Sequence, residues 1–121
     1  MTFLAIRGAT TCQHDSKEDI TKATQELVTA MMTKNDVAQN QIVSILFTST
    51  ADLVSEFPAT AARGLGLDDV PLMCAQELNI AGSMPRCIRA MMHVDIPKSR
   101  SDVQHVFLGD ATQLRKDLLK D

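Results

Sequence analysis

Residues 86–95 (RCIRAMMHVD) constrain the fold more than any other stretch, because apolar side chains alternate along it. This period is typical of a strand whose one face is buried, and that face would carry Ile88, Ala90, Met92 and Val94. Arg89 falls in the middle of the opposite face. A guanidinium keeps its charge, so this position is unfavourable unless an anion lies nearby. The pattern predicts a strand with an anionic partner or ligand for Arg89.

Glu77 is the nearest candidate anion upstream of this strand. It lies twelve residues before Arg89, just after the apolar run that ends at Cys74 and before the turn signal at 81–83. Two interpretations are open. Arg89 and Glu77 could neutralise each other as a structural ion pair, or they could form the two polar ends of a pocket.

Apolar periodicity along the rest of the chain predicts the other elements. The expected strands cover residues 2–8, 42–50, 70–74 and 103–108, and the strand at 42–50 is apolar on both faces, so both faces should be covered. An amphipathic helix is expected at 16–34, capped by Asp15 or Ser16, a short helix from Pro58 to residue 65, and a helical turn at 111–121. The order predicts an α+β fold: one domain, residues 1–121, with a mixed five-stranded sheet and both helices on one side.

Charge and composition limit the classes of partner. The net charge is −3, basic runs are absent and aromatic side chains are scarce, which argues against nucleic acid. No apolar run approaches the ~20 residues that a membrane span needs, and the N-terminus lacks the basic region of a signal peptide. Three cysteines without a Cys-x-x-Cys pair favour a reducing cytoplasm over a disulfide framework.

The arginines are distributed differently from the lysines. All six lysines lie in stretches that should be solvated, whereas four of the six arginines lie in or beside apolar segments: Arg7, Arg63, Arg89 and Arg115. The planar guanidinium pairs well with carboxylates in desolvated places. A small carboxylate-bearing ligand is therefore indicated, although for Arg7 taken alone an exposed strand-end position is the favoured interpretation.

Several kinds of catalytic chemistry find no support in the sequence. Cys74 would need a nearby base to act as a nucleophile, but the three histidines are scattered. No residues have the paired spacing of zinc ligands, and the five glycines form no phosphate-binding loop. We therefore expect no covalent intermediate, no metal and no cofactor.

Four segments in this order resemble the small monofunctional chorismate mutases of the trimeric pseudo-α/β-barrel class: 6–11 (IRGATT), 57–63 (FPATAAR), 70–77 (VPLMCAQE) and 85–94 (PRCIRAMMHV). The resemblance runs from Phe3 to about Leu118. It implies an isomerase of aromatic amino-acid biosynthesis that converts chorismate to prephenate by a Claisen rearrangement. Such a reaction needs no nucleophile, no proton transfer and no cofactor.

The resemblance also implies roles for individual residues. Arg89 would direct its charge at the ether oxygen, Arg7 would bind substrate carboxylate and enol-pyruvyl oxygens, and Glu77 would accept the ring hydroxyl. The remaining substrate-binding residues would be Phe57, Arg63, Met73, Cys74, Phe107, Leu114 and Arg115. The family implies a cytoplasmic homotrimer with active sites at the subunit interfaces.

This sequence departs from the family's usual pattern at three positions. Phe107 stands where Tyr is usual, Leu67 where Trp is common and Thr60 where Lys often occurs. The first change removes a hydroxyl contact to the substrate and should weaken binding rather than abolish the reaction.

Two other functions could explain the arginines. One is an imine or enamine deaminase on a related trimeric fold, and the other is a non-catalytic binding module for a carboxylate metabolite. The deaminase does not account for the combination of Cys74, Glu77 and Arg89.

Overall fold

The computed structural model describes residues 1–114. Its elements follow the order β1 (Thr2–Thr11), α1 (Lys17–Asn35), β2 (Ile42–Ser49), α2 (Pro58–Arg63), β3 (Leu72–Gln76), β4 (Cys87–Ile96) and β5 (Val106–Phe107). Short 3₁₀ helices cover Gln39–Gln41, Arg100–Asp102 and Gly109–Gln113. None of the helices within residues 1–114 has the length and apolar character needed to span a bilayer.

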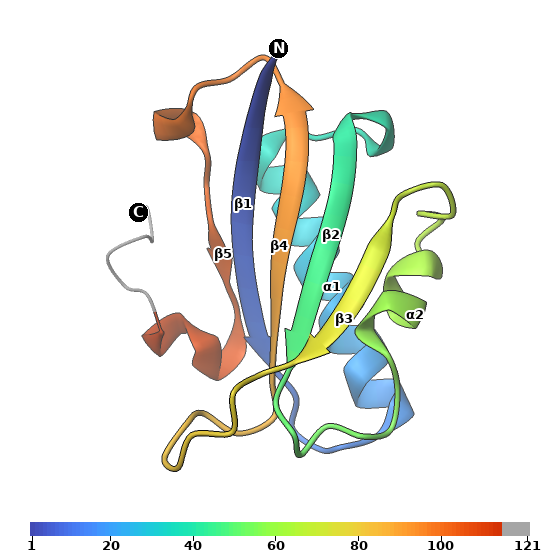
Figure 1. The fold of residues 1–121 in the computed structure, drawn as a ribbon, viewed down its shortest axis with the longest axis vertical. Helices are drawn as coiled ribbons and strands as arrows, with labels where there is room; N and C mark the ends of the chain where they lie inside the picture. Colours follow the sequence, from blue (N-terminus) through green and yellow to red (C-terminus); the bar gives the residue numbers. More distant parts are fainter. Residues whose placement is uncertain (115–121) are drawn as a thin grey trace.

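The strands form one mixed sheet with the order β3-β2-β4-β1-β5. The central strand β4 pairs antiparallel with β1 and β2, whereas the edge strands β5 and β3 run parallel to their neighbours. Figure 1 looks onto the sheet from the side opposite α1, which runs behind it, and α2 lies beside β3 at one edge. The predicted α+β architecture with a five-stranded mixed sheet is confirmed.

Helix α1 covers one face of the sheet and closes the core. Ser16 is the N-cap, since its Oγ accepts a hydrogen bond from the Asp19 N–H at 3.1 Å. The buried face of the helix packs on the sheet through Ile20, Leu27, Val28 and Met31. The helix follows the prediction to within one residue at each end. At Gly8 of β1, a Cβ atom would lie 2.4 Å from the sulfur of Met31, so only glycine fits this contact without displacement.

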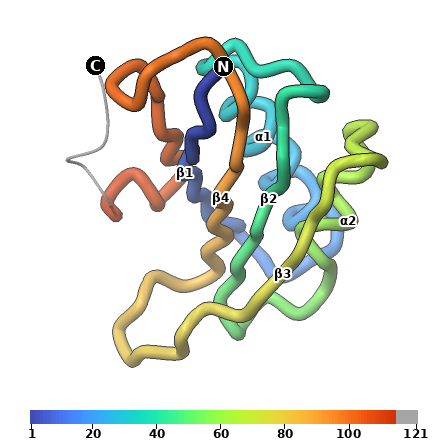
Figure 2. The backbone as a smooth tube through the Cα atoms, turned by 45° about the horizontal axis from the view of Figure 1, so that its top comes forward, coloured from blue at the N-terminus to red at the C-terminus, as the bar shows by residue number. Residues whose placement is uncertain are grey.

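No α-helix among the described residues covers the other face of the sheet (Figures 1 and 2), and the 3₁₀ helix at Gly109–Gln113 packs against part of it, at Ala9 and Phe107. We call it the open face. Its apolar side chains include Phe3, Leu46 and Met73, which are 64%, 39% and 65% exposed. The prediction that β2 is covered on both faces is therefore wrong for the single chain.

Three strand boundaries differ from the predicted ones for physical reasons. Strand β1 continues past Gly8 to Thr11 because β4 offers pairing partners as far as Cys87. Strand β3 starts at Leu72 rather than at residue 70, because Pro71 has no N–H to donate, and it continues along β2 to Gln76.

Strand β5 is the third difference, with two residues in place of the predicted 103–108. The buried Asn35 side chain takes both backbone groups of Gln104: its Oδ1 accepts from the Gln104 N–H at 2.7 Å, and its Nδ2 donates to the carbonyl at 2.8 Å. Residue 104 is thus held at the end of α1 and is not available to pair with β1. The strand can begin only after it.

The carboxylate of Asp52 fixes the start of β4. Both oxygens of Asp52 accept from the Arg86 N–H, at 3.2 and 2.9 Å, and hold Arg86 in the left-handed conformation (φ 48°). Thr50 donates its hydroxyl to Asp52 and accepts from the Cys87 N–H at 3.0 Å. Burial pushes the pKa of Asp52 upward, but the hydrogen bonds from Thr50 and the backbone outweigh it and leave the pKa below the ordinary 3.8.

We expect Asp52→Asn to lower the melting temperature at pH 7 by roughly 2–5 °C, because the amide is a weaker acceptor than the carboxylate. The pKa of Asp52 is lower in the folded chain, so its stabilisation is complete above pH 3.8 and is lost as the pH falls through the folded pKa. Thermal melts of wild type and variant should therefore converge in acid. A difference that stays constant with pH would contradict this assignment. Asp69→Asn, at an exposed position, is the control and should melt like wild type.

Candidate active site

Arg89 lies in the middle of the sheet, on the open face. Its cross-strand partners are Ala9 on β1 and Thr48 on β2. Its neighbours along β4, Ile88 and Ala90, point to the α1 side and are 0% and 4% exposed. The Arg89 side chain keeps 37% of its surface exposed, so the charge sits on a rigid strand and still faces outward.

Glu77 is placed beside Arg89 by the end of β3. Its backbone N–H donates to the Ser49 carbonyl at 2.9 Å and so continues the pairing of β3 with β2. Its Oε1 lies 2.8 Å from Nε of Arg89 and accepts a hydrogen bond from the Thr48 hydroxyl, also at 2.8 Å. The predicted encounter of Arg89 and Glu77 does occur. Thr48 was missed from sequence, because a hydroxyl directly after the apolar run 42–47 does not reveal which side chain it will contact.

The contact between Arg89 and Glu77 is an ion pair by distance, but it is not an aligned hydrogen bond. The Nε atom is buried, and its N–H has no hydrogen-bond partner within residues 1–114. The carboxylate 2.8 Å away still compensates the Arg89 charge at this depth. Because 37% of the Arg89 side chain is exposed, a ligand on the open face can still reach it.

Arg7 and Phe107 form a second contact on the open face. Arg7 is half-buried on β1, opposite Met91, which places it diagonally across from Arg89 on the neighbouring strand. Its guanidinium carbon lies 6.0 Å from the centre of the Phe107 ring, at the outer limit of a cation–π contact. The buried Phe107 packs with Ala9 and Ala111, and Leu114 packs against the same cluster.

Three further predicted residues lie around α2 and β3 and not on the open face. Phe57 and Cys74 line a cleft of about 370 Å³ between the end of β2, the start of α2 and β3. The Cys74 sulfur accepts from the Ala59 N–H at 3.3 Å, which ties β3 to α2. Arg63 is exposed in the last turn of α2. Arg115 lies outside the described residues.

The structure therefore divides the predicted residues into two groups. Arg7, Glu77, Arg89, Phe107 and Leu114 belong to the open face, whereas Phe57 and Cys74 belong to the cleft. Cys74 pairs with Phe47, which is buried on the α1 side, so it points away from the open face. Met73 is the exception, since it pairs with Leu46 on the open face. One chain does not bring the two groups together in a single pocket.

The thiols and histidines offer little basis for other chemistry. Burial raises the pKa of Cys12 to about 11 and also raises the pKa of Cys87, so neither is a ready nucleophile. The three histidines contact different elements: His14 meets Asp19, His93 meets Ser44, and His105 meets Arg7. Within residues 1–114, no group of three His, Cys, Asp or Glu side chains could hold a metal ion.

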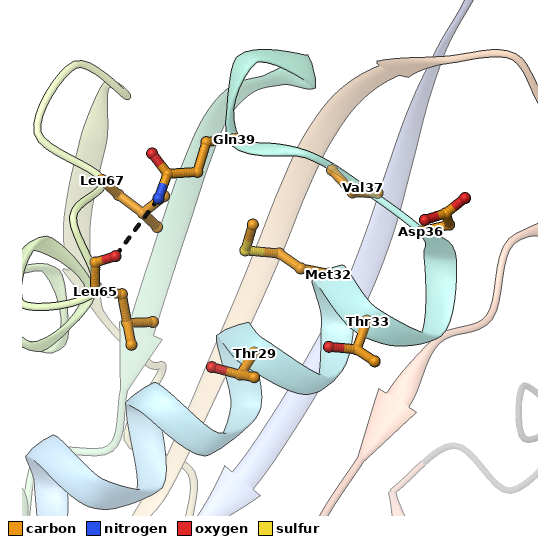
Figure 3. Close-up of a pocket in the computed structure, with 8 residues that line it drawn as sticks. All are labelled: Thr29, Met32, Thr33, Asp36, Val37, Gln39, Leu65 and Leu67. Carbon is orange, nitrogen blue, oxygen red and sulfur yellow. Dashed lines mark hydrogen bonds between the residues drawn. The ribbon is translucent and has the colours of Figure 1, made fainter.

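A groove of about 470 Å³ opens at the other end of α1, as Figure 3 shows. Met32 and Val37 line it from one side and Leu65 and Leu67 from the other. The predicted site residues are not among its lining residues, so it is separate from both groups described above.

Comparison with known proteins agrees with this geometry. The family described as chorismate mutase type I matches residues 3–118. The chain is 44% identical over 116 residues to Chorismate mutase AroH of Thermus thermophilus, covering 93% of each protein. It is 37% identical over 119 residues to Chorismate mutase AroH of Bacillus subtilis (strain 168), covering 98% of this chain and 94% of that protein.

A solved structure has the same fold as this chain. It is that of chorismate mutase from Clostridium thermocellum Cth-682, with a TM-score of 0.90, 44% identity, and coverage of 92% of this chain and 99% of that one. The α+β pseudo-barrel fold expected from the sequence is therefore confirmed. The chain belongs to the chorismate mutase type I family.

Proposed function

We propose that this chain rearranges chorismate to prephenate on its open face, with Arg89 as the principal catalytic charge. As a member of the type I family it is a chorismate mutase, an isomerase of aromatic amino-acid biosynthesis. The observation that carries the assignment of Arg89 is its place on the central strand of the open face, 2.8 Å from Glu77 and with 37% of its side chain exposed.

The reaction is a single concerted step within one molecule. The ether C–O bond breaks while a new C–C bond forms, and no proton or group leaves the substrate. Negative charge grows on the ether oxygen as its bond to carbon lengthens. A fixed cation at that oxygen therefore stabilises the transition state more than the ground state, which is the requirement for catalysis.

Glu77 and Thr48 keep the Arg89 charge in place. The carboxylate lies 2.8 Å from Nε, and the Thr48 hydroxyl holds the same carboxylate oxygen from the neighbouring strand. The other carboxylate oxygen, Oε2, can then accept the ring hydroxyl of the substrate. This arrangement binds the compact conformer in which the two reacting carbons are close.

Arg7 binds the carboxylate and enol-pyruvyl oxygens of the substrate. It lies on the same face as Arg89 and diagonally across from it on the neighbouring strand, so the two cations can pair with the two negative charges of the substrate. Phe107 supports Arg7 through its ring and offers no hydroxyl. We expect weaker substrate binding than a tyrosine at this position would give.

A homotrimer completes the site at the subunit interface. Three of the rim residues, Phe57, Arg63 and Cys74, lie at the α2 and β3 edge, while the cations lie on the open face. Apposition of one chain's edge on its neighbour's open face would bring the two groups together and would cover exposed Leu46 and Met73. Met73 and Leu114 would complete the lining among the described residues. The three free cysteines support a reducing compartment, the cytoplasm.

Neither of the other functions considered from the sequence is favoured by a feature of the structure. A binding module and a deaminase would both use the arginines, but the relatives at 37–44% identity are all named chorismate mutases. Loss of the diene absorbance of chorismate, with prephenate as the product, separates the three functions directly.

We expect Arg89→Ala to lower kcat by roughly 10²–10³-fold, the usual effect of removing one fixed donor to a developing oxyanion. Arg63→Ala should lose less than tenfold, because this side chain is exposed on a helix end and contacts no reacting atom. Steady-state kinetics with chorismate measures both, and melting temperatures exclude unfolding as the cause. Equal losses in the two variants would contradict the roles assigned to them.

The trimer is tested by mass and by one substitution on the open face. Light scattering should give roughly three times the 13.2 kDa of one chain. Leu46→Glu introduces a charge at the proposed interface and should produce smaller species with little activity. Ala38→Glu, at an exposed site near the end of α1, is the matched control and should keep both mass and turnover. An active monomer would rule out the interfacial site.

A further inference from the structure

We propose that His105 is a positioning residue for Arg7, acting as a side-chain substitute for a strand partner. This inference rests on the proposed function, because it concerns how the substrate-binding cation is held. The observation behind it is one hydrogen bond: the backbone N–H of Arg7 donates to Nδ1 of His105 at 2.9 Å.

The short length of β5 explains why a side chain is needed there. Backbone pairing between β1 and β5 covers only Gly8 with Val106 and Ala9 with Phe107, and the Leu108 N–H then donates to the Ala9 carbonyl at 2.9 Å. One residue before Val106, the imidazole takes the position that a strand carbonyl would otherwise occupy. The ladder along β1 is thereby extended to Arg7.

His105 is itself held in place from both sides along the chain. On one side, Asn35 binds both backbone groups of Gln104, at 2.7 and 2.8 Å. On the other side, Val106 is buried in the core at 0% exposure. The imidazole therefore projects from a fixed segment, and its hydrogen bond can hold β1 in place at Arg7.

The backbone and the side chain of Arg7 both contact the same three-residue segment, 105–107. His105 binds the backbone N–H, and the guanidinium carbon lies 6.0 Å from the centre of the Phe107 ring. The direction of the Arg7 side chain follows from its backbone, so a shift of β1 at this residue would move the charge relative to Arg89. Misplacement by about 1 Å at a site of this kind can reduce the rate by roughly 10²-fold.

The hydrogen bond also fixes the chemical state of the imidazole. A backbone N–H can only donate, so Nδ1 must be the acceptor and carries no proton, and Nε2 carries the hydrogen of the neutral ring. An asparagine at residue 105 could place its carbonyl oxygen close to the position of Nδ1. Leucine has nearly the same shape as asparagine but has no acceptor.

The matched pair His105→Asn and His105→Leu tests the proposal. We expect His105→Leu to lower kcat/KM for chorismate by roughly 10–100-fold and His105→Asn to stay within about threefold of wild type. Rescue by asparagine distinguishes an acceptor for Arg7 from a residue that only fills space. Equal losses in the two variants, or no loss in either, would overturn the proposal.

A measurement on the wild-type protein keeps the test valid if a variant does not fold. In ¹⁵N-labelled protein, a nitrogen–nitrogen coupling across the hydrogen bond should join the Arg7 amide to Nδ1 of His105. A proton found on Nδ1 would overturn the proposal. A wild-type chain that leaves chorismate unchanged would instead overturn the proposed function, and the coupling would still report whether His105 holds Arg7.

Discussion

The central position of β4 is the constraint on which the rest of this structure depends. The strand pairs along its whole length with β1 and along most of it with β2, so its residues cannot shift without disrupting both neighbours. Its α1 side is closed by apolar side chains that are almost fully buried. The strand thus has one buried face and one accessible face. Such a strand can hold a charge in position before a reaction begins.

The pair of Arg89 and Glu77 shows how a charge can be kept on such a strand. A guanidinium without a counter-ion would be unfavourable at this depth, and Glu77 supplies that counter-ion at 2.8 Å. The Thr48 hydroxyl binds the same carboxylate oxygen, and 37% of the Arg89 side chain remains exposed beside this pair. Of the two interpretations of the sequence, the structure contains the ion pair, and the polar pocket stays a prediction.

The sequence alone predicted the features that depend on local periodicity. Helix α1 and the alternation along β4 follow directly from the spacing of apolar residues, and the contact of Glu77 with Arg89 followed from an unpaired charge in an apolar strand. Features that depend on distant partners could not be found this way. The shortening of β5 comes from Asn35, and the role of Thr48 comes from strand pairing, and neither leaves a mark in the local sequence.

Exposure of the open face was misjudged for a related reason. The apolar residues on both sides of β2 predicted a strand buried on both faces, yet Leu46 is 39% exposed in one chain. Hydrophobic patterning reports whether a surface is to be covered, but not whether the cover comes from the same chain. The division of the site residues between two faces would have the same origin if the proposed homotrimer forms.

Phe107 has one consequence for how the protein responds to its surroundings. A tyrosine beside Arg7 would carry a phenol, which becomes an anion in strongly alkaline solution and would then compete with a carboxylate for the arginine. A benzene ring has no such ionisation, and a guanidinium remains charged far above neutrality. The contact of Arg7 with Phe107 thus keeps one electrostatic state from neutral to strongly basic media.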